Sequence, residues 1–320
     1  MSNVIPRGWP TGRPDRLLRL AARALRRLAN AVLFRSRAST LIQLSPGLLI
    51  LVALFALPLL FLAWVSLWRH SPNSFGPTPL TLENYRRFLF DGFFLRSILR
   101  TLQLGIVTTL VTLALGYPLA LIMARSTARV RGFLLVLVLT PLMVSVVVRV
   151  FGWMVILGDT GLINKALLAL GLIDQPLRIM NTMAAVVIGL AQVEFAFMVL
   201  PIFSALLGVG RSLEEAAATL GASPWRVFRH VVLPLSLPGV AAGSALVFSL
   251  SVSAFVQPQL LGGSSFFVMT TLMYQQITAT LNWPFGAAIG FIILGTALLT
   301  LILLGVAMRK ISPRRAGHAT

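Results

Sequence analysis

Long uncharged runs alternate with short, Arg-rich segments along the chain. The longest run, from residue 230 to residue 308, contains no Asp, Glu, Lys or Arg. An α-helix needs about 20 predominantly apolar residues to cross the hydrocarbon core of a bilayer. This run is therefore long enough for two helices, and the polar stretch from Gln257 to Pro284 divides it. The pattern predicts an all-α integral membrane protein with six membrane-spanning helices, at Leu41–Trp68, Ile98–Ala124, Gly132–Leu157, Met183–Val209, Leu237–Leu260 and Phe285–Met308.

The basic residues indicate how these helices are oriented, because cytoplasmic loops carry an excess of Lys and Arg. If the N-terminus is inside, the cytoplasmic segments hold 19 of the 27 Lys and Arg residues and the outer segments hold six. The cytoplasmic segments are then 1–40, 125–131, 210–236 and 309–320, and the outer segments are 69–97, 158–182 and 261–284. We therefore expect both termini to be cytoplasmic.

The composition agrees with a membrane protein. Hydrophobic residues make up 57% of the chain and charged residues only 11%, with a mean hydropathy of +0.90. Soluble domains carry about 25% charged residues. A net charge of +19 can indicate nucleic-acid binding, but these basic residues lie between apolar runs. The lipid bilayer is thus an expected partner and nucleic acid is not. Because the chain has no Cys, disulfides and Cys metal sites are excluded.

The Arg-rich segment 1–40 allows three interpretations. The favoured one is a cytoplasmic tail that sets the orientation of the first helix. Its Arg residues and apolar residues also fall on opposite faces of a helix, which suits the membrane interface. An Arg-rich, acid-poor start is, finally, typical of organelle transit peptides.

Residue patterns that carry catalysis are missing from the sequence. It contains no G-x-x-x-x-G-K-[ST] phosphate loop, no H-E-x-x-H metal helix and no G-x-S-x-G elbow. Its three histidines, His70, His230 and His318, fall in different loops or tails. We therefore expect a non-catalytic protein without a cofactor or a metal ion.

The loop after the fourth span has the most specific pattern. Ser212 can cap a helix from 213 to 220, with Glu215 three residues later as in a capping box. Gly221 follows where a left-handed helix end is needed. Ser223 and Pro224 then favour the start of a second helix, which Pro234 is expected to stop. Two short helices with apolar residues at the membrane surface suit a partner's groove.

This loop resembles the coupling loop of binding-protein-dependent ABC transporter permeases of bacteria. The family pattern is E-A-A, three residues, G, nine residues, an aliphatic residue, one residue, then L-P. Its counterparts here are Glu215, Ala216, Ala217, Gly221, Val231, Leu233 and Pro234. Only Val231 departs, since Ile is usual at that position. The resemblance implies that this loop inserts into a cleft on an ATPase subunit.

The resemblance covers roughly residues 95–310 and implies an importer-type ABC permease fold for a bacterial inner membrane protein. Combined with the apolar runs and the charge pattern, it divides the chain into a first helix at 41–68, a periplasmic loop at 69–97, a five-helix permease core at 98–308 with its coupling loop at 211–235, and a cytoplasmic tail at 309–320. The implied partners are ABC ATPase subunits, a periplasmic solute-binding protein, and a second permease subunit that is a paralogue or a second copy of this chain. A secondary transporter is not favoured, because no internal repeat is visible.

Less specific sequence matches resemble the spermidine/putrescine branch of that family. They are LTLENYRRFL before the second span, PLMVSVVVRVFGWMVILGDTGLINKALLALGLID around the third, and NWPFGAAIG at the start of the sixth. A small solute, with a polyamine first, is the expected cargo. Neighbouring branches that carry ferric iron, phosphonates or thiosulfate remain alternatives.

Two charges fall within the predicted spans, Arg149 in the third and Glu194 in the fourth. Charges at membrane depth are costly and are usually paired or functional. At 1.5 Å per residue the two lie about 12 and 16 Å from the outer ends of their spans, so a buried ion pair is expected. Alternatively, Glu194 lines the translocation path for a cationic solute, with Trp153 adding a cation–π face near Arg149.

Two further features concern packing at the end of the chain. The segment 261–284 is expected to form a short outer helix, or else to touch the binding protein or line the outer gate. The last two spans begin GVAAG and GAAIG. Small residues four apart allow neighbouring helices to approach closely.

Overall fold

The computed structural model describes residues 45–47, 49–71, 78–264 and 266–311. Apart from turns and an isolated antiparallel bridge between Trp68 and Leu80, these residues are helical or irregular. The chain divides into two compact units, Met1–Leu62 and Ala63–Thr320. The predicted tail 1–40 and most of the tail 309–320 lie outside the described residues.

The prediction of six spans is confirmed, since the described residues contain six helical stretches that are long and apolar enough to cross a membrane. Their ranges are Ser45–Ser66, Gly92–Arg125, Val146–Ala169, Met183–Leu207, Pro224–Ser253 and Trp283–Leu303. The helices of the second unit are α2 (Glu83–Phe90), α3 (Gly92–Arg125), α4 (Ala128–Leu139), α5 (Val146–Leu157), α6 (Leu162–Ala169), α7 (Met183–Leu207), α8 (Arg211–Thr219), α9 (Pro224–Val227), α10 (Leu233–Ser253), α11 (Val256–Leu261), α12 (Met269–Thr278) and α13 (Trp283–Ile311).

The bounds predicted for the third span are wrong. The stretch 132–157 is not one helix, because α4 ends at Leu139 and a 3₁₀ turn, Thr140–Met143, separates it from α5. Pro141 causes the break, since proline lacks a backbone N–H and clashes with the preceding turn. Arg149 in α5 donates a hydrogen bond at 2.6 Å to the carbonyl oxygen of Pro141, which also accepts from the N–H of Val144 at 3.4 Å. The candidate span here is instead Val146–Ala169, which combines α5 and α6.

The start and end predicted for the fifth span are also wrong. Pro234 does not stop the second loop helix, because α9 continues through a π-helical turn, Phe228–Val232, into α10. A π-helical turn shifts the backbone acceptor by one residue, and Leu233 N–H donates to the carbonyl of Phe228. Pro234 follows directly after this turn, where the shifted hydrogen bonding accommodates its missing N–H. The helix ends at Ser253, and α11 is a separate short helix.

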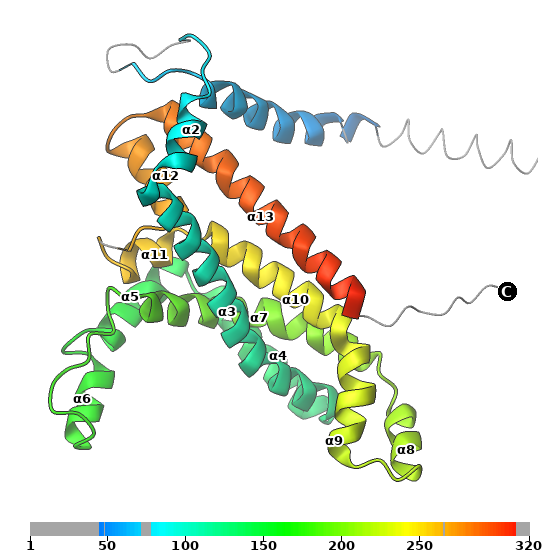
Figure 1. Ribbon diagram of the computed structural model, residues 1–320. Coiled ribbons are helices and arrows are strands. Elements are labelled where there is room, and N and C mark those ends of the chain that lie inside the picture. The colour runs from blue at the N-terminus through cyan, green and yellow to red at the C-terminus, as the bar shows by residue number, and fades with distance from the viewer. Residues whose placement is uncertain (1–44, 48, 72–77, 265, 312–320) are drawn as a thin grey trace, which may run out of the picture. The chain divides into compact units, whose positions relative to one another are not determined.

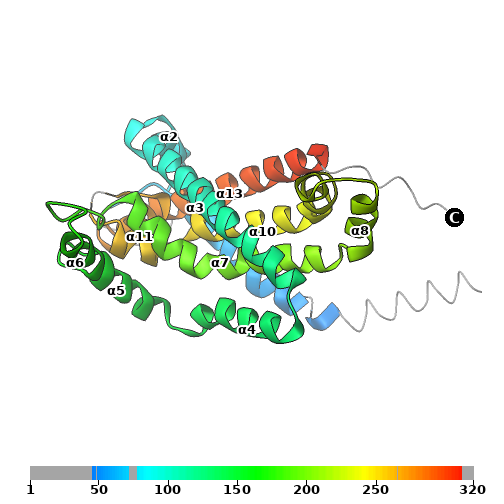
Figure 2. The same ribbon diagram turned by 90° about the horizontal axis from the view of Figure 1, so that it is seen from below.

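Helices α3, α7 and α10 pack against one another and form the centre of the second unit. Figure 1 shows α8 and α9 at one end of these helices and α2, α11 and α12 at the other, and Figure 2 agrees. By the charge pattern, the end with α8 and α9 is the cytoplasmic one. At the opposite end, Phe88 of α2 and Phe285 of α13 are fully buried with Met269 of α12. The short helix expected between the last two spans is α12.

The small residues that open the last two spans lie at close helix contacts, as expected. A Cβ atom at Gly239 of α10 would lie 2.5 Å from the carbonyl oxygen of Pro201 in α7. One turn further on, Gly243 faces Met198 of α7 in the same way. In α13, a Cβ atom at Gly286 would lie 2.6 Å from Ile277 of α12. Each glycine therefore permits a neighbouring helix to approach its backbone directly.

We predict that Gly239→Ala destabilises the protein although Ala is the better helix former. Within a free helix the change would gain roughly 1 kcal/mol. Here the new methyl group meets the backbone of α7, and overpacking of this kind costs about 1–3 kcal/mol. Gly295→Ala in α13 is the matched control, because a Cβ atom there would meet no other atom within 4 Å. Thermal unfolding in detergent should give a lower Tm for Gly239→Ala only, and equal Tm values would contradict the contact.

Candidate functional site

The loop between α7 and α10 folds into two helical arms joined at Gly221. The first arm, α8, begins at Arg211 after Gly210, so the predicted capping box at Ser212 and Glu215 is wrong. Ser212 already lies inside the helix, and no side chain caps its start. Arg211, the first residue of the helix, is anchored through its Nη2, which donates at 2.8 Å to the carbonyl oxygen of Arg125.

Gly221 has the left-handed conformation predicted for it, with a φ of +80°. Its N–H donates to the carbonyl of Ala218 at 2.9 Å, and the N–H of Ala222 donates to Ala217 at 3.1 Å. This pair of bonds is the Schellman motif, which satisfies carbonyl groups at the end of a helix. Pro224 then occupies the first position of α9, also as predicted. The reversal between the two arms therefore depends on a residue without a Cβ atom.

The tip of the loop exposes large apolar side chains. Leu220, directly before Gly221, is 88% exposed, and Trp225 at the start of α9 is 66% exposed. Trp225 stacks on Phe228, with ring centroids 5.4 Å apart. Of the motif residues, Glu215, Ala216 and Gly221 are exposed, whereas Ala217, Val231, Leu233 and Pro234 are partly buried. The motif thus has one exposed face and one face that packs against the rest of the chain.

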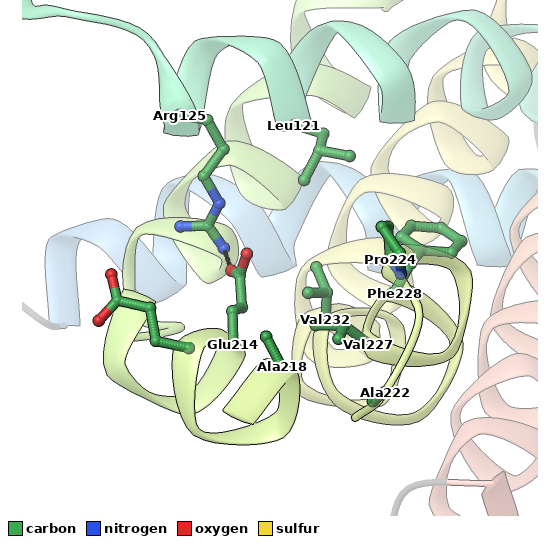
Figure 3. Close-up of a pocket in the computed structure, with 10 residues that line it drawn as sticks. Leu121, Arg125, Glu214, Ala218, Ala222, Pro224, Val227, Phe228 and Val232 are labelled. Carbon is green, nitrogen blue, oxygen red and sulfur yellow. Dashed lines mark hydrogen bonds and ion pairs between the residues drawn. The ribbon is translucent and has the colours of Figure 1, made fainter. Parts of the chain in front are cut away.

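The inner side of the loop is held by an ion pair that sequence reasoning missed. Arg125, the last residue of α3, pairs with Glu214 of α8, and Figure 3 shows the two side chains pointing toward one another. A cavity of about 440 Å³ lies beside the pair, between α8, α9 and the end of α3. Its lining consists of Leu121, Arg125, Glu214, Glu215, Ala218, Ala222, Pro224, Val227, Phe228 and Val232. Charge alone could not find this pair, because Arg125 lies 89 residues before Glu214.

The predicted ion pair between Arg149 and Glu194 does not form. Glu194, only 3% exposed, instead accepts a hydrogen bond from the hydroxyl of Ser251 in α10 at 2.5 Å. The Arg149 side chain bonds to the carbonyl of Pro141 instead, in the turn that separates α4 from α5. The predicted ion pair between Arg149 and Glu194 assumes two straight helices in which both charges lie at a matching depth. The third span is not a straight helix, because α4 and α5 are separated by the 3₁₀ turn.

Trp153, the third residue predicted to line the translocation path, lies beside Gln192 of α7. The sequence pattern did not single out this glutamine. The indole Nε1–H of Trp153 donates to the side-chain oxygen of Gln192 at 2.7 Å. Gln192 is exposed, although it lies near the middle of Met183–Leu207. Within the described ranges, no three His, Cys, Asp or Glu side chains come together as a metal ion would require.

Comparisons with known proteins agree with this geometry. The family described as "Binding-protein-dependent transport system inner membrane component" matches residues 116–318. The spermidine/putrescine transport system permease protein PotB of Haemophilus influenzae is 33% identical over 81% of this chain and 89% of its own length. PotB of Escherichia coli is 36% identical over 74% of this chain and 86% of its own.

Among solved structures, a bacterial ABC transporter involved in the import of the acidic polysaccharide alginate contains a chain with the same fold. The TM-score is 0.71 at 17% identity, over 91% of this chain and all of that one. Together with the six candidate spans, the relatives identify a multi-pass inner membrane protein. The chain belongs to the family of inner membrane components of binding-protein-dependent transport systems.

Proposed function

We propose that this chain is the permease subunit of an ATP-driven importer that moves a polyamine such as spermidine or putrescine across the inner membrane. Separate ATPase subunits bind and hydrolyse ATP, and a periplasmic binding protein delivers the solute. A second permease subunit, a paralogue or a second copy, completes the pathway. The two PotB relatives support a polyamine over ferric iron, phosphonate or thiosulfate. The sequence itself has no phosphate loop with which to bind ATP.

The observation that carries this proposal is the exposed apolar tip of the α8–α9 loop. Leu220 and Trp225 are exposed at this tip, and Arg211, Arg226 and Arg229 lie on either side of it in the sequence. Exposed apolar residues rimmed by charge mark protein-binding surfaces. A short helix with apolar anchors inserts well into a groove, here a groove on the ATPase.

We further propose that the solute path passes Trp153 and Gln192. The oxygen of Gln192 accepts from Trp153, but the NH2 group of an amide that faced lipid near mid-membrane would have no acceptor there, so Gln192 is expected to face a polar path or the second subunit. Glu194 lies two residues on, about 200° around the helix, which turns it toward α10 instead. Its place on the path, like that of Arg149, stays a prediction. Both side chains are bonded within this chain.

Affinity purification from native membranes, followed by uptake in proteoliposomes, tests the proposed function. We expect an ABC ATPase to co-purify with the chain. We also expect radiolabelled spermidine to accumulate only with ATP on the ATPase side and binding protein on the other, and putrescine to compete. Accumulation driven by an ion gradient without ATP would contradict the proposal. ATP-dependent uptake of another solute alone would contradict the polyamine assignment.

We predict that substitutions at Gly221 separate backbone strain from side-chain size. Gly221→Val should abolish most uptake while the protein still inserts, since a left-handed conformation costs L-residues about 1–2 kcal/mol and suits β-branched residues least. Gly221→Asp should abolish it through a new charge at the exposed tip. Gly221→Asn is the matched control, because Asn tolerates this conformation and the site has open space. Ala217→Asp should also abolish uptake, because Ala217 packs against the core. ATPase co-purification and spermidine uptake are the measurements, and normal uptake by Gly221→Val would overturn the role of the turn.

We predict that Glu194→Gln keeps most uptake, because the amide oxygen of Gln can still accept the bond from Ser251. Glu194→Leu should lower the stability, since it leaves the buried hydroxyl unpaired at a cost of about 1–3 kcal/mol. Tm in detergent and spermidine uptake separate the two roles. Loss of uptake by Glu194→Gln at an unchanged Tm would instead show that the carboxylate charge serves the path.

A further inference from the structure

Helix α8 is attached to the rest of the chain without a buried side chain of its own. None of its residues is buried, and the cavity of about 440 Å³ opens beside it. Ala217 alone among its apolar residues packs against the core cluster. Besides its backbone connections to α7 and α9, a helix held so weakly by apolar contacts can pass on a displacement through its polar attachments.

Those polar attachments converge on Arg125 at the end of α3. Its guanidinium pairs with Glu214 through Nη2, while Nη1 donates to the carbonyl of Val209 at 3.4 Å. Its own carbonyl oxygen accepts the bond from Arg211. The side chains of Arg125 and Glu214 are only 23% and 27% exposed. Partial burial reduces solvent screening, so this pair is stronger than a pair on an open surface.

Helix α3 connects this attachment to the opposite end of the molecule. It runs for 34 residues from Gly92 to Arg125, continuous through Pro118, which corresponds to about 51 Å at helical rise. Near its far end, the hydroxyl oxygen of Thr101 accepts a hydrogen bond from the N–H of Met269, the first residue of α12. A movement of Arg125 along α3 therefore reaches the helix expected at the outer face.

We propose that the Arg125–Glu214 ion pair is the joint through which movement of α8 is passed to α3 and so to the outer end of the permease. The proposal rests on the proposed function, because it assumes that an ATPase displaces α8. Arg125 and Glu214 are positioning residues that touch neither solute nor nucleotide. Glu215, exposed on the same helix, is left to contact the ATPase.

Distances between spin labels in the intact complex test the joint directly. The chain has no Cys, so Cys pairs are unique once the partners' cysteines are replaced. One pair joins Thr219 of α8 to Leu115 of α3, and a reference pair joins Thr219 to Ile302 of α13; all three are exposed. Between nucleotide-free and ATP-bound complexes, we expect the reference distance to change and the α8–α3 distance to stay constant.

In the Arg125→Gln variant the α8–α3 distance should become nucleotide-dependent. Arg129→Gln, an exposed Arg at the start of α4, is the matched control and should behave as the wild type. A wild-type α8–α3 distance that changes as much as the variant's would overturn the proposal. So would a reference distance that never changes. If no ATPase co-purifies with the wild-type chain, the proposed function is wrong, and so is the proposed role of the Arg125–Glu214 ion pair.

A second measurement separates transmission from simple loss of structure. Arg125→Gln and Glu214→Gln should lower the ratio of spermidine imported to ATP hydrolysed by about tenfold, within the usual range of coupling between sites. The swapped variant, Arg125→Glu with Glu214→Arg, should recover most of that ratio. A purely structural role would lower uptake and ATP hydrolysis together and leave the ratio unchanged. That result, or loss of the ATPase from both single variants, would overturn the joint.

Discussion

The close approach of α7 and α10 is the contact on which the rest of the second unit depends. At Gly239 the backbone of α10 meets the carbonyl of Pro201 with no side chain between them. Toward the other end of α10, the Ser251 hydroxyl bonds to Glu194 of α7, so apolar and polar contacts hold the same pair of helices. Helix α3 joins them where Gly105 faces Phe248 of α10. In lipid, such close packing supplies the attraction that burial from water supplies elsewhere.

This core would connect the proposed ATPase-binding loop to the membrane-spanning helices. The α9 arm continues through the π-helical turn Phe228–Val232 into α10, so it is covalently part of the core. The α8 arm is joined to α3 by the ion pair of Arg125. A force on the tip would therefore reach α10 directly and α3 through the ion pair, and both helices pack against α7, to which α8 is joined by residues 208–210. Rigid-body displacement of packed helices is a common form of switching in proteins.

Turns and helix starts that depend on one residue could be predicted from the sequence, whereas contacts between residues far apart in the sequence could not. The turn at Gly221 and the start of α9 at Pro224 follow from single-residue backbone preferences, and both appear as predicted. Pro234 was expected to end a helix, but the π-helical turn before it removes the conflict, and residue preferences do not reveal such turns. The partners of Glu194 and Arg125 lie 57 and 89 residues away, so only the packing of helices could identify them.

Cross-linking from Leu220 tests the central claim, that the α8–α9 tip enters a groove on an ATPase, most directly. A photoreactive label on Leu220→Cys, the only cysteine in the chain, would be activated in native membranes. The control is Leu172→Cys, which is 67% exposed and lies in a segment predicted to face outward. The account predicts a cross-link to an ABC ATPase from residue 220 and none from residue 172. Equal labelling of the ATPase from both positions, or none from residue 220 in any nucleotide state, would contradict it.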